Sequence, residues 1–141
     1  MRHSRIAFFY FLCVLLSMNI FANIEMLKLD PGFKINIFAE DLDQPRQMIE
    51  SKNGTIFIGE RSGQIIALLD SDGNGQADSK RVIADDLTYS TGVSIFEGDL
   101  YFSEISKIWK IQDIENWLQK NSSGFPEKIL VTEDLPEDKW H

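Results

Sequence analysis

The stretch Ser51–Leu69, SKNGTIFIGERSGQIIALL, indicates the fold class. It holds two β-prone runs, Thr55–Gly59 and Gln64–Leu69, each preceded by a glycine-containing turn. Asn53-Gly54 before such a run is the strongest short hairpin signal, and Arg61-Ser62-Gly63 provides the next turn. The stretch therefore predicts antiparallel strands joined by tight turns.

The same pattern recurs along the chain. An Asp-Leu pair ends at Leu42, Leu87 and Leu135, which are 45 and 48 residues apart. A repeat of this length is typical of one four-stranded propeller blade. Around the opening stretch we expect further strands at Gln47–Glu50, Lys80–Ala84, Gly92–Phe96, Leu100–Ser103, Lys107–Ile111 and Lys128–Val131, with a short helix or ordered insertion at Asp113–Lys120.

The repeat predicts an all-β protein with a β-propeller fold. Blade 1 is expected at about 33–85, blade 2 at about 86–131, and the start of a third at 132–141. Two blades cannot close a ring, so residues 23–141 are expected to be the N-terminal part of a longer propeller domain. A two-sheet sandwich is the alternative, although a sandwich does not predict the repeat.

Residues 1–22 have the pattern of a secretory signal peptide. Arg2 and Arg5 precede the apolar run Ile6–Leu16, and small Ala22 marks a cleavage site. We therefore expect an exported protein, periplasmic or extracellular, with no stable membrane span after cleavage. The alternative is an uncleaved anchor, but polar residues interrupt the apolar run before it reaches about 20 residues.

The negative charge of the mature part, after the signal segment, disfavours some classes of binding partner. The net charge of the chain is −8, and all 22 acidic residues follow the signal segment. An acidic surface repels phosphate, so nucleic acid and anionic membranes are poor partners. The one cysteine, Cys13, lies in the signal segment, so the mature part has no disulfide and depends on core packing or a metal.

The segment Asp70–Asp78, DSDGNGQAD, resembles the first half of a calcium loop. Oxygen donors stand at alternate positions and Gly75 at the sharp turn. The twelfth position, normally a bidentate Glu, is Arg81. The loop is either a small calcium site or a plain Asx and Gly turn without an ion. The candidate ligands are Asp70, Asp72, Asn74, Gln76 and Asp78.

Polar residues precede the first strand of each repeat, where ligands bind at the channel mouth of a propeller. Arg46 and Gln47 hold this place in the first repeat and Thr91 in the second. In the third, His141 lies six residues after Leu135. Histidine suits proton transfer because its pKa is near neutrality. The alternatives are a surface salt bridge for Arg46 and an ordinary loop role for His141.

In ordered combination, several segments resemble the start of the glucose/sorbosone dehydrogenases. They are Leu29–Phe33 with Ile35–Ala39, Leu42–Met48 (LDQPRQM), Gly54–Arg61 (GTIFIGER), Leu68–Asp78 and Gly98–Ile111 (GDLYFSEISKIWKI). The resemblance covers Leu29–His141. It implies an exported six-bladed propeller that oxidises a sugar or sugar aldehyde with pyrroloquinoline quinone (PQQ) and calcium.

The resemblance also implies roles for single residues. LPEDKWH, Leu135–His141, is similar to the family segment that carries the general base, so His141 corresponds to that base. Tyr89–Gly92 replaces the Asn/Gln-rich segment of the glucose enzymes and favours the sorbosone-type branch. The family's quinone contacts lie mostly in later blades, so this chain alone is expected to be inactive. A cytochrome could serve as electron acceptor.

Two other functions are compatible with the sequence. One is a non-catalytic, calcium-stabilised propeller that binds a glycan or a protein partner. The other is a lactonase-type hydrolase, in which a channel metal activates water.

Overall fold

The computed structural model describes residues 27–90, 92–120 and 123–137, in two units, 1–36 and 37–141. In the first unit the chain turns at Pro31-Gly32, where the Phe33 N–H donates to the Asp30 carbonyl at 3.2 Å. Within the described ranges no helix is both long and apolar enough to cross a membrane. The predicted signal segment, 1–22, lies outside these ranges.

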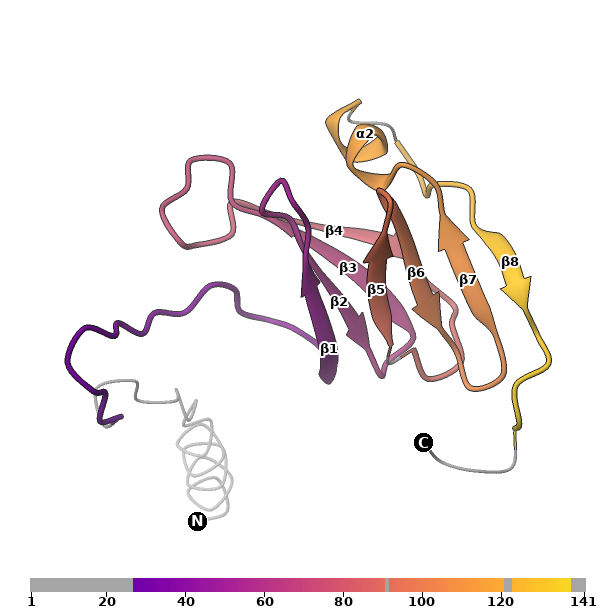
Figure 1. The fold of residues 1–141 in the computed structure, drawn as a ribbon, viewed down its shortest axis with the longest axis horizontal. Coiled ribbons are helices and arrows are strands. Elements are labelled where there is room, and N and C mark those ends of the chain that lie inside the picture. The colour runs from indigo at the N-terminus through magenta and orange to yellow at the C-terminus, as the bar shows by residue number, and fades with distance from the viewer. Residues whose placement is uncertain (1–26, 91, 121–122, 138–141) are drawn as a thin grey trace, which may run out of the picture. The chain divides into compact units, whose positions relative to one another are not determined.

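The second unit contains two four-stranded antiparallel sheets, each with its strands in chain order (Figure 1). This confirms the all-β class, and each predicted strand is present, with its ends shifted by two residues at most. The closed ring stays a prediction. The first sheet holds β1 (Pro45–Glu50), β2 (Ile56–Glu60), β3 (Gln64–Leu69) and β4 (Ser79–Ala84). The second holds β5 (Val93–Phe96), β6 (Asp99–Ser103), β7 (Ile108–Ile111) and β8 (Ile129–Thr132), with α2 (Ile114–Gln119) between β7 and β8.

The two sheets match position by position. Met48 pairs with Ile58 in the first sheet, and Val93 pairs with Phe102 in the second. Met48 and Val93 each lie six residues after the leucine of an Asp-Leu pair. The register therefore makes Phe102 the counterpart of Ile58, and the sequence repeat is also a structural repeat.

The two sheets contact each other through faces that do not correspond to one another in the repeat. Phe57 is completely buried on one face of the first sheet, whereas Ile58 points to the other face. The second sheet contributes Phe102, the counterpart of Ile58, to the core that contains Phe57. Successive blades stack in this way, while two sheets related by a two-fold axis would bring matching faces together. The shared core comprises Phe57, Ile65, Ala67, Ile83, Ala84 and Leu87 with Val93, Leu100, Phe102, Ile111, Ile114 and Leu118.

The other face of the first sheet is covered by the chain that enters it. Ile58, Ile66 and Leu68 form a second, smaller core, on which Phe38, Ala39, Leu42 and two further partly buried residues pack. The Phe38 carbonyl accepts a hydrogen bond from the Ala77 N–H at 2.8 Å, which fixes this segment.

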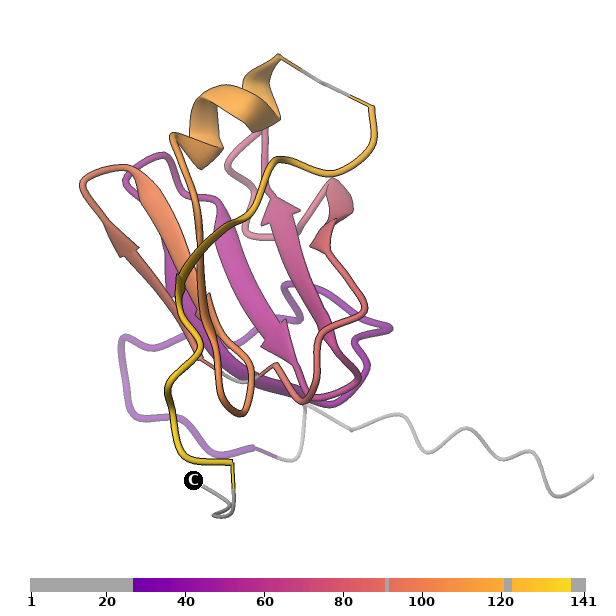
Figure 2. The same ribbon diagram turned by 90° about the vertical axis from the view of Figure 1, so that its right-hand side faces the viewer.

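Helix α2 joins the two sheets at one end (Figure 2). Its Ile114 and Leu118 are buried in the shared core. Arg81 of β4 stacks over the Trp117 ring at 4.6 Å from the ring centre and donates to the Leu118 carbonyl at 3.3 Å. The predicted insertion is thus a short helix that ties the first sheet to the second.

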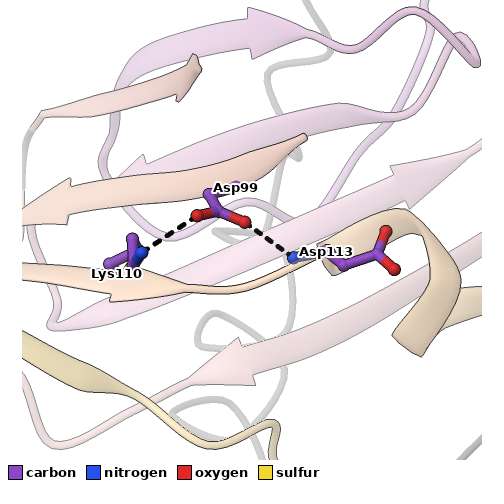
Figure 3. A network of polar contacts seen from close by, with 3 residues as sticks. All are labelled: Asp99, Lys110 and Asp113. Atoms are coloured by element: carbon purple, nitrogen blue, oxygen red, sulfur yellow. Dashed lines mark hydrogen bonds and ion pairs between the residues drawn. The ribbon is translucent and has the colours of Figure 1, made fainter. Parts of the chain in front are cut away.

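The start of α2 is held by a polar network on the open face of the second sheet (Figure 3). The Asp99 carboxylate accepts the Asp113 N–H at 3.0 Å and pairs with Lys110 at 3.0 Å. The Asp113 hydrogen bond, followed by Lys110, lowers the pKa of Asp99. Lys110 stands where the first sheet has buried Ala67, so this face is more polar than its counterpart.

Gly63 lies against the backbone of Leu87 in a left-handed conformation. Its φ is +103°, and an added Cβ would lie 2.3 Å from the Leu87 carbonyl oxygen. Gly63→Ala should lower the free energy of unfolding by about 3 kcal/mol, from backbone strain together with the clash. Gly54→Ala is the control, because Gly54 has φ +84° with no atom near its added Cβ, and should cost only about 1–2 kcal/mol. Equal losses in urea unfolding would contradict the close approach.

Candidate functional site

The first strands of the two sheets meet at the predicted channel mouth. β1 lies beside β5, and the Gln47 side-chain oxygen accepts the Val93 N–H at 3.3 Å. Arg46 is exposed and stands at an irregularity in the β1–β2 register, where a bulge re-aims side chains. The structure thus brings Gln47 to the start of β5. Thr91 and His141 lie outside the described residues.

A close polar contact fixes the start of β5. The Gly92 N–H donates to Ser103 Oγ at 3.2 Å, and the Ser103 N–H donates to the Gly92 carbonyl at 3.0 Å. An added Cβ on Gly92 would lie 2.7 Å from Ser103 Oγ, so a larger residue here would displace the Ser103 hydroxyl. Ser90 is fully buried, and its hydroxyl has no hydrogen-bond partner among the described residues.

A pair of glutamates forms a repeated clamp that was not predicted from the sequence. Glu60, at the end of β2, accepts the Asp43 N–H at 2.9 Å. Glu104, directly after β6, accepts the Thr88 N–H at 2.8 Å. Hydrogen bonds to an ionised carboxylate are stronger than neutral ones. Each glutamate therefore holds the chain just before it enters the first strand of its sheet.

The signal for this clamp was present in the sequence. Asp43 and Thr88 directly follow the Asp-Leu pairs, and the glutamates lie 17 and 16 residues further on. Aligning the repeats on these pairs would have placed Glu60 over Glu104 within one residue.

The predicted calcium loop connects β3 to β4, and its acidic residues converge. Carboxylate oxygens of Asp70, Asp72 and Asp78 all lie within 4.8 Å of one another. The loop also closes through its own hydrogen bonds, since Asp70 accepts the N–H groups of Gly73 at 2.8 Å and Gly75 at 2.9 Å. The oxygen donors fit a hard cation such as calcium, and the hydrogen bonds fit a plain Asx turn.

The other predicted ligands take part in the same loop. The Asn74 side-chain amide donates to Asp72 at 2.9 Å, and the Gln76 N–H donates to the Asn74 side-chain oxygen at 2.8 Å. Arg81, where a bidentate Glu would stand in a full calcium loop, is bound to α2 instead. The acidic donors that converge in the loop are the three aspartates.

A cleft of about 350 Å³ lies beside Glu104. It borders the chain segment that leads to β5 and the β6–β7 turn. Its lining carries two carboxylates, one ammonium group and two hydroxyl groups. The lining residues are Thr88, Glu104, Ile105, Ser106, Lys107 and Glu137.

Comparison with known proteins identifies a shared fold. No family model matches the chain. The structure of a family AA12 carbohydrate-active enzyme from Trichoderma reesei matches 71% of this chain and 26% of its own, with 17% identity and a TM-score of 0.56. The holo pyranose dehydrogenase PQQ domain from Coprinopsis cinerea matches 53% and 19%, with 19% identity and a TM-score of 0.47. The two stacked sheets are thus a fold also found in a carbohydrate-active enzyme.

One curated sequence is similar as well. An uncharacterised protein of Borreliella burgdorferi is 28% identical over 98 residues, which are 67% of this chain and 24% of that protein. The chain therefore spans about a quarter of the length of this relative and of the AA12 enzyme.

Ser71 allows a test of the ion-free loop. Its hydroxyl and its N–H both donate to Asp78 and lower the pKa of that carboxyl. A lowered pKa stabilises the fold above the ordinary range for Asp, and this contribution is lost as the pH falls through the folded-state pKa. Ser71→Ala should raise the pKa of Asp78 toward its ordinary value in a carboxyl NMR titration. Ser79→Ala, next to Asp78, should leave it unchanged, and an unmoved pKa in Ser71→Ala would refute the contact.

Proposed function

We propose that the chain is the N-terminal part of an exported propeller oxidoreductase that acts on a sugar or a sugar aldehyde. The observation that carries the proposal is the stacking of two repeats with their first strands side by side, joined by Gln47 and Val93. The fold shared with an AA12 carbohydrate-active enzyme and the segments similar to glucose/sorbosone dehydrogenases support the same class.

His141 is the proposed general base. It follows the Asp-Leu pair of the third repeat by the same six residues that separate Met48 and Val93 from theirs. A base at the channel mouth would take the proton of the sugar hydroxyl while a hydride leaves the same carbon. Arg46, Gln47 and Thr91 are proposed to contact the substrate at this mouth.

The cofactor is proposed to be PQQ, which supplies the electron sink when bound. Among the described residues we assign no quinone ligand, and we expect the quinone contacts in later blades of the longer protein. Calcium is proposed in the Asp70–Asp78 loop, because three aspartate carboxylates converge there. The sugar or aldehyde is the proposed partner, with a cytochrome as a candidate electron acceptor. We propose a periplasmic or extracellular location from the signal segment 1–22.

The proposed base is tested in the longer protein, supplied with PQQ and calcium. His141→Ala should lower kcat for dye-linked oxidation of aldoses about 10²- to 10⁴-fold, with a smaller change in KM, because a general base acts on the chemical step. Lys139→Ala, two residues earlier, is the control and should retain turnover. Unchanged kcat in His141→Ala would contradict the role of His141.

The proposed calcium loop is tested with this chain. Millimolar calcium should raise the melting temperature by about 5 °C, because a cation that binds only the folded state stabilises it. Asp72→Asn should remove most of this shift. Glu127→Gln, an exposed acid outside the loop, should not. If calcium leaves the melting temperature of the parent chain unchanged, the loop is a plain Asx turn.

A further inference from the structure

We propose that the cleft beside Glu104 is a binding site for a neutral sugar, and that this binding needs no cofactor. This Glu104 cleft is lined by Thr88, Glu104, Ile105, Ser106, Lys107 and Glu137 and has a volume of about 350 Å³. That volume lies at the lower end of the range for small-molecule sites, which suits a single sugar ring.

Glu104 is held in place before any ligand arrives. One carboxylate oxygen accepts the Thr88 N–H at 2.8 Å, and the other accepts the Trp109 indole N–H at 2.5 Å. An ionised carboxylate offers about four acceptor sites, so these two bonds leave capacity for hydroxyl groups of a ligand. A rigid acceptor costs little ordering on binding, which favours affinity.

The first repeat supplies an internal comparison. Glu60 makes the same clamp, but its side chain is only 1% exposed and its second oxygen faces the Ser62 hydroxyl at 3.5 Å. Glu104 is partly exposed and lines the cleft. Trp109 takes the place that Ile66 has in the first sheet, where no indole donor is present. The clamping glutamate is therefore accessible to a ligand in the second repeat and buried in the first.

The charges of the lining disfavour an anion. Glu104 and Glu137 outnumber Lys107, so the lining has a net charge of −1. A neutral polyol fits the carboxylates and the ammonium group together, because each hydroxyl group can donate to a carboxylate and accept from an ammonium group. The hydroxyls of Thr88 and Ser106 can act in either sense. A sugar ring carries several such groups on neighbouring carbons.

The probe is methyl α-D-glucopyranoside, whose blocked anomeric carbon keeps it from being an anomeric oxidation substrate. In ¹⁵N NMR titrations of this chain, the Trp109 indole and Thr88 amide signals should shift and saturate with a Kd of about 1–10 mM. Gluconate should bind several-fold more weakly, because its carboxylate is repelled by the net negative lining. Failure to oxidise any sugar leaves this result unaffected, so the two proposals can fail separately.

Variants at the rim locate the site without touching the core. Lys107→Met and Glu137→Gln should each weaken binding about tenfold, because each removes a hydrogen bond to a charged group. Lys107 and Lys128 both lie over the Trp109 ring, at 5.9 and 4.9 Å from its centre. Lys128→Met is the matched control, because Lys128 does not line the cleft. Unsaturated shifts up to about 100 mM sugar, or unchanged affinity in both rim variants, would overturn the proposal.

Discussion

The apolar contact between the two sheets is the interaction on which the rest of the structure depends. Phe57 and its neighbours in the first sheet form one buried core with Leu100, Phe102 and Ile111 of the second. Each fully buried side chain of this size contributes about 1.5–3 kcal/mol. One face of the first sheet packs on the non-corresponding face of the second, which leaves the other face of each sheet for a further neighbour. The same packing can therefore be repeated from one sheet to the next, as propeller blades require.

The polar contacts follow from this stacking. It sets β1 beside β5, which lets Gln47 of one repeat accept a hydrogen bond from Val93 of the next. The two glutamate clamps then hold the segments before these strands, and α2 ties the outer ends of the sheets together. The proposed mouth and the Glu104 cleft both border the segment that Glu104 fixes. The positions of Gln47 and of the two clamping glutamates thus depend on an apolar core to which none of them belongs.

The elements that could be predicted from the sequence are those whose structure is determined by residues close together in the chain. Strands such as β2 and β3 were predicted because glycine turns and β-prone runs need no distant partner. The nature of the Asp113–Lys120 insertion was not decided, because α2 is stabilised by distant Arg81 and the shared core. The clamps of Glu60 and Glu104 were missed because a side chain reaching a backbone amide across a loop leaves no periodic pattern. The Asp70–Asp78 loop was placed correctly between strands, and its ion stays a prediction.

The most direct test of the stacked repeat is a set of NOE contacts between the sheets. Ring and methyl protons of Phe57, Ile65 and Ile83 should show NOEs to Leu100, Phe102 and Ile111, since these side chains form one core. Contacts from Phe57 to Tyr101 and Val131, its matching face in the second sheet, would instead show a two-fold sandwich and contradict the account.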